Sequence, residues 1–359
     1  MRPAIPVVQG KTQDLLQAHL SAARALMATA RRMYTPVGVR VADRVSRAWM
    51  ERTGNPLLPE LDALAAIVGE PGLHLLNASY EWGCTTGVSG GVLLRTLDWP
   101  FSGLGRHVAV LDTEGAAGRY LSVTWPGFAG VLTAMAPGRF AVAINQAKAF
   151  HGWVTGALEW PVNRWRMLRS PHLPPAHLLR KVCDEAPDYA TALRMLTETP
   201  ICLPVFFTIA GPNGEGAVIE REPARAHVHP GPAACANHWH YPGLQGTAPR
   251  LTCRLDRTSG YGGMSHVRHA TMLENLGATE DFRWLQPPVL CRLTRLACVM
   301  DPGAGSMSVM GLEGGQQATE ILQWQPDSEQ SGEARIVAKP PGWRPANEGH
   351  EQSTTHSLG

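Results

Sequence analysis

Long apolar runs, paired cysteines and an excess of charge of either sign are all missing from this sequence of 359 residues. No stretch approaches the roughly 18 consecutive apolar residues that a membrane-spanning helix needs, and residues 1–10 lack the apolar core of a signal peptide. The seven cysteines include no C-x-x-C pair, which argues against a disulfide framework and against a cysteine zinc site. We therefore expect a cytoplasmic protein that does not span a membrane.

Positive and negative charges nearly cancel, so the net charge does not indicate a class of partner. A net charge of +2 without a dense block of Lys and Arg gives no support for nucleic-acid binding. Hydrophobic residues make up 44% of the chain and charged residues 17%, which is typical of a globular protein. The 37 glycines and 29 prolines indicate many turns and exclude a long coiled coil.

Helical and strand patterns alternate in blocks along the chain. Apolar residues at three- and four-residue spacing predict helices over 12–32, 41–54 and 58–69, so we expect the first seventy residues to be helical. Further helices are predicted within 153–199 and over 264–276, and residues 340–359 have the composition of a disordered tail. Short β-rich runs separated by glycine predict antiparallel strands at 92–97, 107–111, 120–125, 131–135, 140–145, 205–210, 217–220, 226–229, 291–300 and 306–310. The pattern favours a layered α+β architecture.

One predicted hairpin brings a thiol close to a carboxylate. If residues 89–91 form its tip, Cys84 lies opposite Thr96, and Asp98 becomes a diagonal neighbour on the same face as Cys84. Arg95 then points to the other face, unless a glycine-assisted bulge brings it round.

No histidine close in sequence offers itself as a base for Cys84. The cysteine's own α-amine could serve if the Gly83–Cys84 bond were cut, because an α-amine has a pKa of about 7.7–8.0 and acts as a base near neutral pH. Taken alone, a cysteine after glycine is more often a small buried apolar residue.

A series of landmarks in fixed order resembles a known family. The sequence is similar to the acid ceramidase and N-acylethanolamine-hydrolysing acid amidase family of cysteine N-terminal nucleophile (Ntn) hydrolases, and more distantly to bile-salt hydrolases and penicillin acyltransferases. The resemblance runs from about residue 73 to residue 310. The landmarks are Asn77, Tyr80 and Glu81 before Cys84-Thr85-Thr86, then Arg95 and Asp98, the block 126–140, Asn145, the block 211–219, Asn237-His238-Trp239 and Asp256-Arg257-Thr258-Ser259.

The resemblance implies a fold and a division of the chain. The fold is a four-layer αββα sandwich. Residues 1–83 form a helical pro-segment, residues 84–339 form the catalytic subunit, and 340–359 remain the tail. The pro-segment stays bound to the catalytic subunit after the cut.

The resemblance also assigns roles to six residues. Cys84 is the nucleophile, and its freed amine is the base. Asp98 holds the amine, and Arg95 favours the charged forms of thiol and carboxyl. Asn237 and Asn145 support the oxyanion, and Arg257 orients Cys84 and the neighbouring acid. Gln146 stands where the ceramidase and amidase branches commonly carry glutamate, which puts their activation at acid pH in doubt here.

The implied reaction is hydrolysis of a linear N-acyl amide, with a fatty or other apolar acyl chain, through a thioester and without a cofactor. Two alternatives stay open. The Gly-Cys-Thr-Thr sequence is closer to the acyltransferases, which pass the acyl group to an amine. The other alternative is a lipid-binding relative without catalysis.

A histidine-rich stretch competes with this assignment. His227, His229, Cys235, His238 and His240 lie within fourteen residues, and His-x-His places both rings on one face of a strand. No H-E-x-x-H motif accompanies them, and prolines interrupt the stretch. We therefore expect surface or loop histidines and no metal ligands, with zinc as the alternative.

The first predicted helix carries an apolar stripe beside three arginines. Arg24, Arg31 and Arg32 share the helix with Leu15, Leu16, Leu20, Leu26 and Met27. Core packing is the expected role of the stripe, because amphipathic helices normally cover their own domain. A peripheral contact with an anionic membrane is the alternative.

Overall fold

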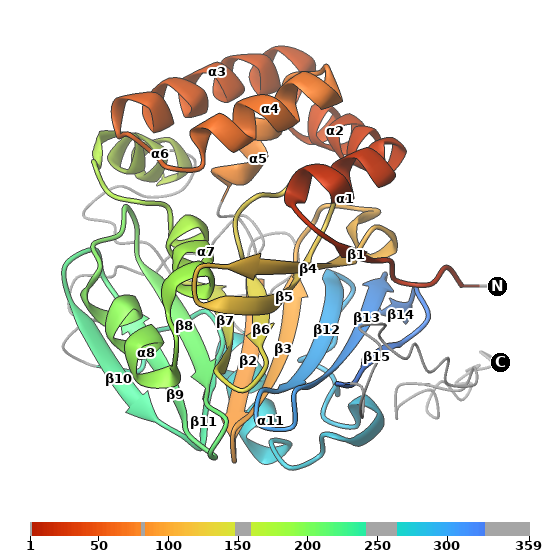
Figure 1. Ribbon diagram of the computed structural model, residues 1–359, viewed down its shortest axis with the longest axis vertical. Coiled ribbons are helices and arrows are strands. Elements are labelled where there is room, and N and C mark those ends of the chain that lie inside the picture. The colour runs from red at the N-terminus through yellow and green to blue at the C-terminus, as the bar shows by residue number, and fades with distance from the viewer. Residues whose placement is uncertain (1, 80–82, 148–158, 242–263, 327–359) are drawn as a thin grey trace, which may run out of the picture.

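The computed structural model describes residues 2–79, 83–147, 159–241 and 264–326. Two β-sheets pack face to face between helices (Figure 1), so the protein has the expected α+β architecture. The predicted tail at 340–359 lies outside the described residues.

The larger sheet is antiparallel except at one edge. Only the pairing of its first two strands in space, β1 and β4, is parallel. Its strands, in spatial order, are β1 (Val7–Gln9), β4 (Ala109–Gly115), β5 (Gly118–Thr124), β6 (Thr133–Ala136), β7 (Phe140–Gln146), β8 (Val205–Ala210), β9 (Gly216–Arg221) and β10 (Ala226–Pro230).

The smaller sheet carries Cys84. In spatial order it consists of β11 (Ala233–Cys235), β2 (Gly83–Ser89), β3 (Val92–Asp98), β12 (Thr294–Asp301), β13 (Ser306–Glu313) and β14 (Gln316–Gln317), with β15 (Leu322–Trp324) also paired to β13. All its pairings are antiparallel. Alternate residues of β2 and β3 therefore face opposite ways.

Helices cover the outer faces of both sheets. On the larger sheet lie α7 (Pro175–Glu185) and α8 (Tyr189–Glu198), while α11 (Ser265–Glu274) lies on β2 and β11. The apolar core divides accordingly. Cys84, Leu93 and Leu97 belong to the main cluster between the sheets. Leu94 belongs to a second cluster with Met272 of α11.

The helices before Cys84 cap one end of the sandwich, together with α6 (Glu159–Arg169) (Figure 1). They are α1 (Thr12–Ala18), α2 (Leu20–Tyr34), α3 (Pro36–Arg52), α4 (Leu58–Val68) and α5 (Leu73–Asn77). The expectation that the first seventy residues are all helical is wrong in one respect. The strand β1 precedes the helices and pairs with β4, which places the start of the chain in the larger sheet.

The membrane alternative for the first predicted helix does not fit its packing. The chain breaks at His19 into α1 and α2, and Leu15, Leu16, Leu26 and Met27 are all buried. Leu20 packs against the main core. These side chains cannot enter a bilayer, since the protein's own core covers them. Across the described ranges, no helix combines the length and the apolar character that crossing a membrane requires.

Candidate active site around Cys84

The β2–β3 hairpin turns through two glycines. Gly90 and Gly91 have φ angles of 56° and 81°, values that a two-residue type I′ turn requires and glycine adopts without strain. Ser89 therefore pairs with Val92, and Cys84 pairs with Leu97. The predicted register, with residues 89–91 as the tip and Cys84 opposite Thr96, is wrong by one residue.

This register change exchanges the faces of Arg95 and Asp98. The inner face of the hairpin is the one that packs on the larger sheet, and the outer face is the one that packs on α11. Thr86 bonds Thr208 of β8 at 2.7 Å, so Cys84, Thr86 and Arg95 share the inner face. Asp98 belongs to the outer face. No bulge is needed to bring Arg95 to the side of the thiol.

Cys84 is completely buried. Burial raises the pKa of its thiol, and the negative charge of Asp98 raises it further. The positive charges of Arg95 and Arg268 act in the opposite direction. In the uncut chain, the thiol is therefore protonated at neutral pH.

The inner face brings Arg95 of the hairpin against Asn145 of β7, two predicted site residues that are both fully buried. Arg95 donates from Nη1 to Asn145 Oδ1 at 3.2 Å and from Nε to Thr133 Oγ1 at 2.7 Å. Its Nη2 has no hydrogen-bond partner among the described residues. The Asn145 amide donates to the carbonyls of Cys235 and Ala236. This arrangement leaves one buried N–H of a guanidinium on the thiol's side of the hairpin.

Asn237 contacts the backbone nitrogen of Cys84. Its Oδ1 accepts the Cys84 N–H at 3.2 Å and Arg268 Nη2 at 2.8 Å, while its Nδ2 donates to the Gln146 carbonyl at 2.8 Å. In the uncut chain, Asn237 thus holds the nitrogen that a cut would free. The predicted role of Asn237 as an oxyanion donor stays a prediction.

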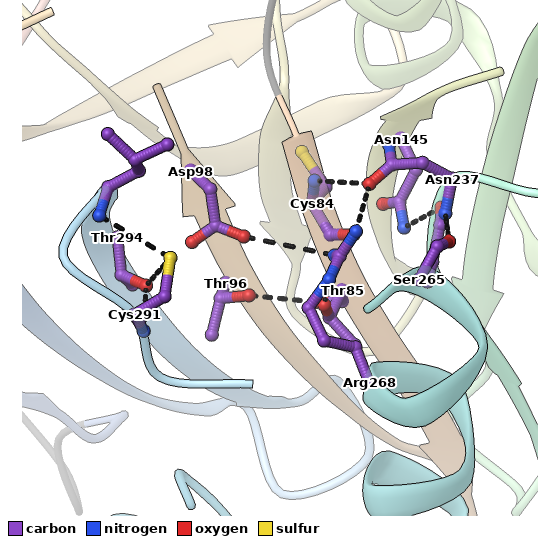
Figure 2. Close-up of polar contacts among 12 residues, drawn as sticks. Cys84, Thr85, Thr96, Asp98, Asn145, Asn237, Ser265, Arg268, Cys291 and Thr294 are labelled. Atoms are coloured by element: carbon purple, nitrogen blue, oxygen red, sulfur yellow. Dashed lines mark hydrogen bonds and ion pairs between the residues drawn. The ribbon is translucent and has the colours of Figure 1, made fainter. Parts of the chain in front are cut away.

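Arg268 is a site residue that the sequence argument missed. From α11 it donates through Nη1 to the Cys84 carbonyl and to Thr85 Oγ1, both at 2.8 Å (Figure 2). Its Nη1 also lies 4.0 Å from Asp98 Oδ2, and both side chains are fully buried. It therefore makes the contacts with Cys84 and its neighbouring acid that were expected of Arg257, which lies outside the described residues.

A sequence signal for Arg268 does exist. Ser265, Arg268 and Met272 recur at three- and four-residue spacing in the helix and are its buried face. An arginine on the buried face of a helix needs a polar partner, because a buried charge without one is costly. The arginine in the predicted helix could have been assigned to the site on this ground.

Asp98 lies opposite Gly83 at the end of the hairpin. Burial raises its pKa to about 6, although Arg268, a hydrogen bond from Thr294, Arg95 and Arg295 all act to lower it. The carboxyl group consequently titrates close to neutral pH, as a group that gives and takes protons must.

A second thiol lies near Asp98. Cys291 accepts hydrogen bonds at Sγ from the Leu293 N–H at 3.4 Å and from Thr294 Oγ1 at 3.6 Å (Figure 2). Burial and the Asp98 charge raise its pKa to about 12. Cys291 is therefore a protonated neighbour, which the sequence argument also missed.

The other landmarks are placed in part. Asn77, the last residue of α5, donates to the Gly127 carbonyl at 2.9 Å and accepts the Ala129 N–H at 2.8 Å. It attaches the segment before Cys84 to the 126–140 block. Tyr80 and Glu81 lie outside the described residues.

Comparison with known proteins supports the resemblance over part of the chain, although no family model matches. Mouse acid ceramidase is 32% identical over 108 residues, covering 29% of this chain and 25% of that protein. Rabbit N-acylethanolamine-hydrolyzing acid amidase is 30% identical over 157 residues, covering 41% and 42%. The matched segment thus spans well under half of these relatives.

Solved structures add likenesses at low identity. A Caenorhabditis elegans N-acylethanolamine-hydrolyzing acid amidase ortholog superimposes with a TM-score of 0.45 and 18% identity, covering 62% of this chain and 93% of that one. A conjugated bile acid hydrolase from Clostridium perfringens gives 0.41 and 12%, covering 71% and 97%. The sequence matches show that part of this chain is similar to acid ceramidase and to N-acylethanolamine-hydrolyzing acid amidase, and they confirm the resemblance to these two proteins that the landmarks predict.

Proposed function

We propose that this protein is a cysteine Ntn amidohydrolase, which cuts its own chain before Cys84 and then cleaves linear N-acyl amides. One observation carries the proposal. Two side chains hold the backbone of Cys84 itself, Asn237 at the N–H and Arg268 at the carbonyl, at the residue where the family landmarks place the cut. Buried backbone groups need a hydrogen-bond partner in any protein, but here both partners are polar side chains from other segments, and they also bond each other at 2.8 Å.

The proposed cut proceeds through a thioester. Cys84 Sγ attacks the Gly83 carbonyl carbon, the Gly83–Cys84 C–N bond breaks, and the thiol proton passes to the Cys84 nitrogen. Water then hydrolyses the thioester, which releases the Gly83 carboxylate and restores the thiol. Asp98, opposite Gly83 and with a pKa of about 6, is the nearby group that can relay protons.

Turnover repeats this chemistry on a substrate. The freed α-amine takes the thiol proton, and Sγ attacks the acyl carbon. The amide C–N bond breaks, and the proton passes to the leaving amine. Water, deprotonated by the α-amine, then hydrolyses the thioester and releases the acid. Asn237 Oδ1 already holds the nitrogen that acts as base.

A row of aromatic side chains in the main core favours an apolar acyl chain. Trp99, Phe101, Trp125 and Phe128 belong to the same buried cluster as Cys84, and neighbouring rings in this row lie 4.7–5.9 Å apart. Leu73 of α5 packs in this cluster as well.

The pairing of β1 with β4 supports continued association of the two pieces. The first piece would contribute a strand to the larger sheet and the buried faces of α1 to α4. Breaking the peptide bond before Cys84 removes none of these contacts.

Intact mass measurement tests the cut, and hydrolysis of a long-chain N-acyl amide tests the activity. We expect two chains that separate between Gly83 and Cys84, and thiol alkylation that removes activity unless substrate is present. An active protein that remains a single 38.8 kDa chain would refute the proposal. Formation of a new amide when a free amine is added would favour the acyltransferase alternative. An uncut chain without labelling at Cys84 would favour a non-catalytic relative.

A further inference from the structure

Two pairs of consecutive residues serve two different clusters. Asn237 and Arg268 contact Cys84, whereas the residues that directly follow them, His238 and His269, belong to a group of imidazoles outside the active site. The consecutive residues Asn237 and His238 lie in the segment after β11, and the consecutive residues Arg268 and His269 lie on α11. Whatever joins His238 to His269 therefore also fixes Asn237 relative to Arg268.

The imidazoles converge closely. Single ligand atoms of His238, His240 and His269 all lie within 4.8 Å of one another. The ring centroid of His240 lies 4.3 Å from that of His238 and 4.1 Å from that of His269. His238 is buried, and the other two are half-buried. His238 lies in a loop, as one of the two expected placements has it, but it is buried. The sequence could not show that His269 joins the group from a separate helix.

Two of these rings are oriented by a hydrogen bond from one of their nitrogens to a neighbouring residue. His238 Nδ1 lies 2.8 Å from Ser265 Oγ, which also accepts the Asn237 N–H at 3.0 Å, and His269 bonds the backbone of Ala234. Metal-binding histidines typically have such a partner on the ring nitrogen that does not face the metal. The third ring, His240, has a buried Nε2 to which no described residue gives a hydrogen bond.

A buried carboxyl group beside the three histidines favours a cation at this position. Glu220 is fully buried beside the group, where its carboxylate accepts the N–H groups of His240 and Tyr241 and lies 3.4 Å from His229 Nε2.

We propose that His238, His240 and His269 bind one transition-metal ion, Zn²⁺ being the expected occupant, at a site separate from Cys84. Three imidazoles suit Zn²⁺, and a water molecule can complete a tetrahedral set. The three ligand atoms, which lie within 4.8 Å of one another, surround a position for one ion. The ion joins the segment after β11 to α11 and thereby holds Asn237 against Arg268.

The test uses the full chain with Cys84→Ala, which removes the active-site thiol and keeps the chain uncut. After chelation and dialysis, Zn²⁺ alone is titrated by calorimetry, and Co²⁺ is followed by visible absorption. We expect one ion per chain and Co²⁺ bands of a tetrahedral nitrogen site without a thiolate charge-transfer band. Failure to bind one ion, or a thiolate band, overturns the proposal.

Variants locate the site. His240→Gln and His269→Gln should each weaken Zn²⁺ binding by at least about 10–100-fold, the loss typical of removing only a hydrogen-bond partner of a ligand. His227→Gln, in the same histidine-rich stretch but stacked on Tyr241, should bind like the parent. Equal binding by all three variants would overturn the assignment. Matching circular dichroism of the metal-free proteins shows that each variant is folded.

Hydrogen exchange tests the link to the active site. Zn²⁺ should slow amide exchange in residues 236–240 and in α11 of the parent chain, and His269→Gln should abolish this protection. Tight binding without protection would contradict the joining role. All these measurements are made on an inactive chain, so they stand or fall independently of the proposed amidohydrolase activity.

Discussion

The two faces of the β2–β3 hairpin carry different parts of the candidate site. The inner face carries the Cys84 thiol with Arg95 and, across the sandwich, Asn145. The outer face carries Asp98 and receives Arg268 from α11. The inner face therefore places the sulfur beside Arg95, while the outer face holds the Cys84 carbonyl, next to the bond that the proposed cut would break.

This difference shows why both faces are needed for the proposed cut. Burial raises the pKa of the Cys84 thiol and of Asp98 alike, but the shift has opposite consequences for reactivity. On the inner face it keeps the nucleophile protonated. On the outer face it brings a proton acceptor close to neutral pH. The thiol and the carboxyl group lie on opposite faces of the strand end, so the proposed cut depends on both faces being in place.

Replacing the nucleophile should have the largest effect. Cys84→Ala removes the atom that forms both thioesters, so we expect no cut and a loss of turnover by several orders of magnitude. Mass spectrometry and amide hydrolysis measure the two results. Cys298→Ala is the matched control, since Cys298 is equally buried and pairs with Arg95 from β12. Turnover by the Cys84→Ala chain would refute the assignment of the nucleophile.

Changing the outer-face arginine should have the next largest effect. Arg268→Lys keeps a positive charge near Asp98 but cannot hold the Cys84 carbonyl, Thr85 and Asn237 together, because lysine lacks the planar fork. We expect the cut and the turnover to slow by about 10²–10³-fold, the range for losing one fixed donor in an active site. Time courses of cutting give the rate.

Arg221→Lys is the control for this change. Arg221 is also buried, but it bonds the Thr199 carbonyl from β9, in the other sheet. This variant can lose stability while its cutting rate stays at the parent value. Equal slowing of both variants would mean that Arg268 acts only through stability.

The fold could be predicted from the sequence where local pattern decides the structure. The strand at 205–210 was predicted with its correct bounds, and the helix predicted over 58–69 ends one residue earlier, because apolar spacing and terminating glycines define both elements. The strand β1 could not be predicted in this way. It is three residues long, and its pairing with β4 crosses about a hundred residues of chain.

The site shows the same division between local and distant information. Cys84, Arg95 and Asp98 lie in one hairpin, and the resemblance identified them, but counting one residue too many in the turn reversed their faces. Arg268 comes from a helix more than 180 residues away from Cys84 and depends on the packing of α11 on β2. Sequence spacing alone carries no information about that packing.

Asp98 on the outer face should make the stability of the folded protein depend on pH. The pKa of Asp98 rises from its ordinary 3.8 to about 6 in the folded protein, so the folded state binds this proton more tightly than the unfolded chain. Its stabilising contribution is complete below pH 4 and is lost as pH rises through 6. The loss amounts to at most about 3 kcal/mol, since one pH unit is worth about 1.4 kcal/mol.

Urea unfolding of uncut Cys84→Ala chains, with and without Asp98→Asn, isolates this contribution. Between pH 4 and pH 6, the free energy of unfolding of the chain with Asp98 should fall relative to that of the Asp98→Asn chain. Above pH 7, the difference between the two chains should stay constant. Taking the difference cancels the histidines, whose lowered pKa values give the opposite slope. A difference that is flat or rises across this window would contradict a raised pKa for Asp98.

The smallest expected effect comes from moving α11 without touching a site residue. A methyl group on Gly87 of the outer face would lie 2.4 Å from Leu276 Cδ2 and 2.9 Å from Met272 Cγ. Gly87→Ala should therefore cost about 1–3 kcal/mol of stability and push α11 away from β2. Arg268 then draws back from the Cys84 carbonyl, and the cut slows by less than in Arg268→Lys.

Gly277→Ala is the control, because Gly277 lies just beyond α11 and faces open space. This variant should leave the stability and the rate of the cut unchanged. A Gly87→Ala chain that loses stability yet cuts at the parent rate would show that the inner face suffices for the cut.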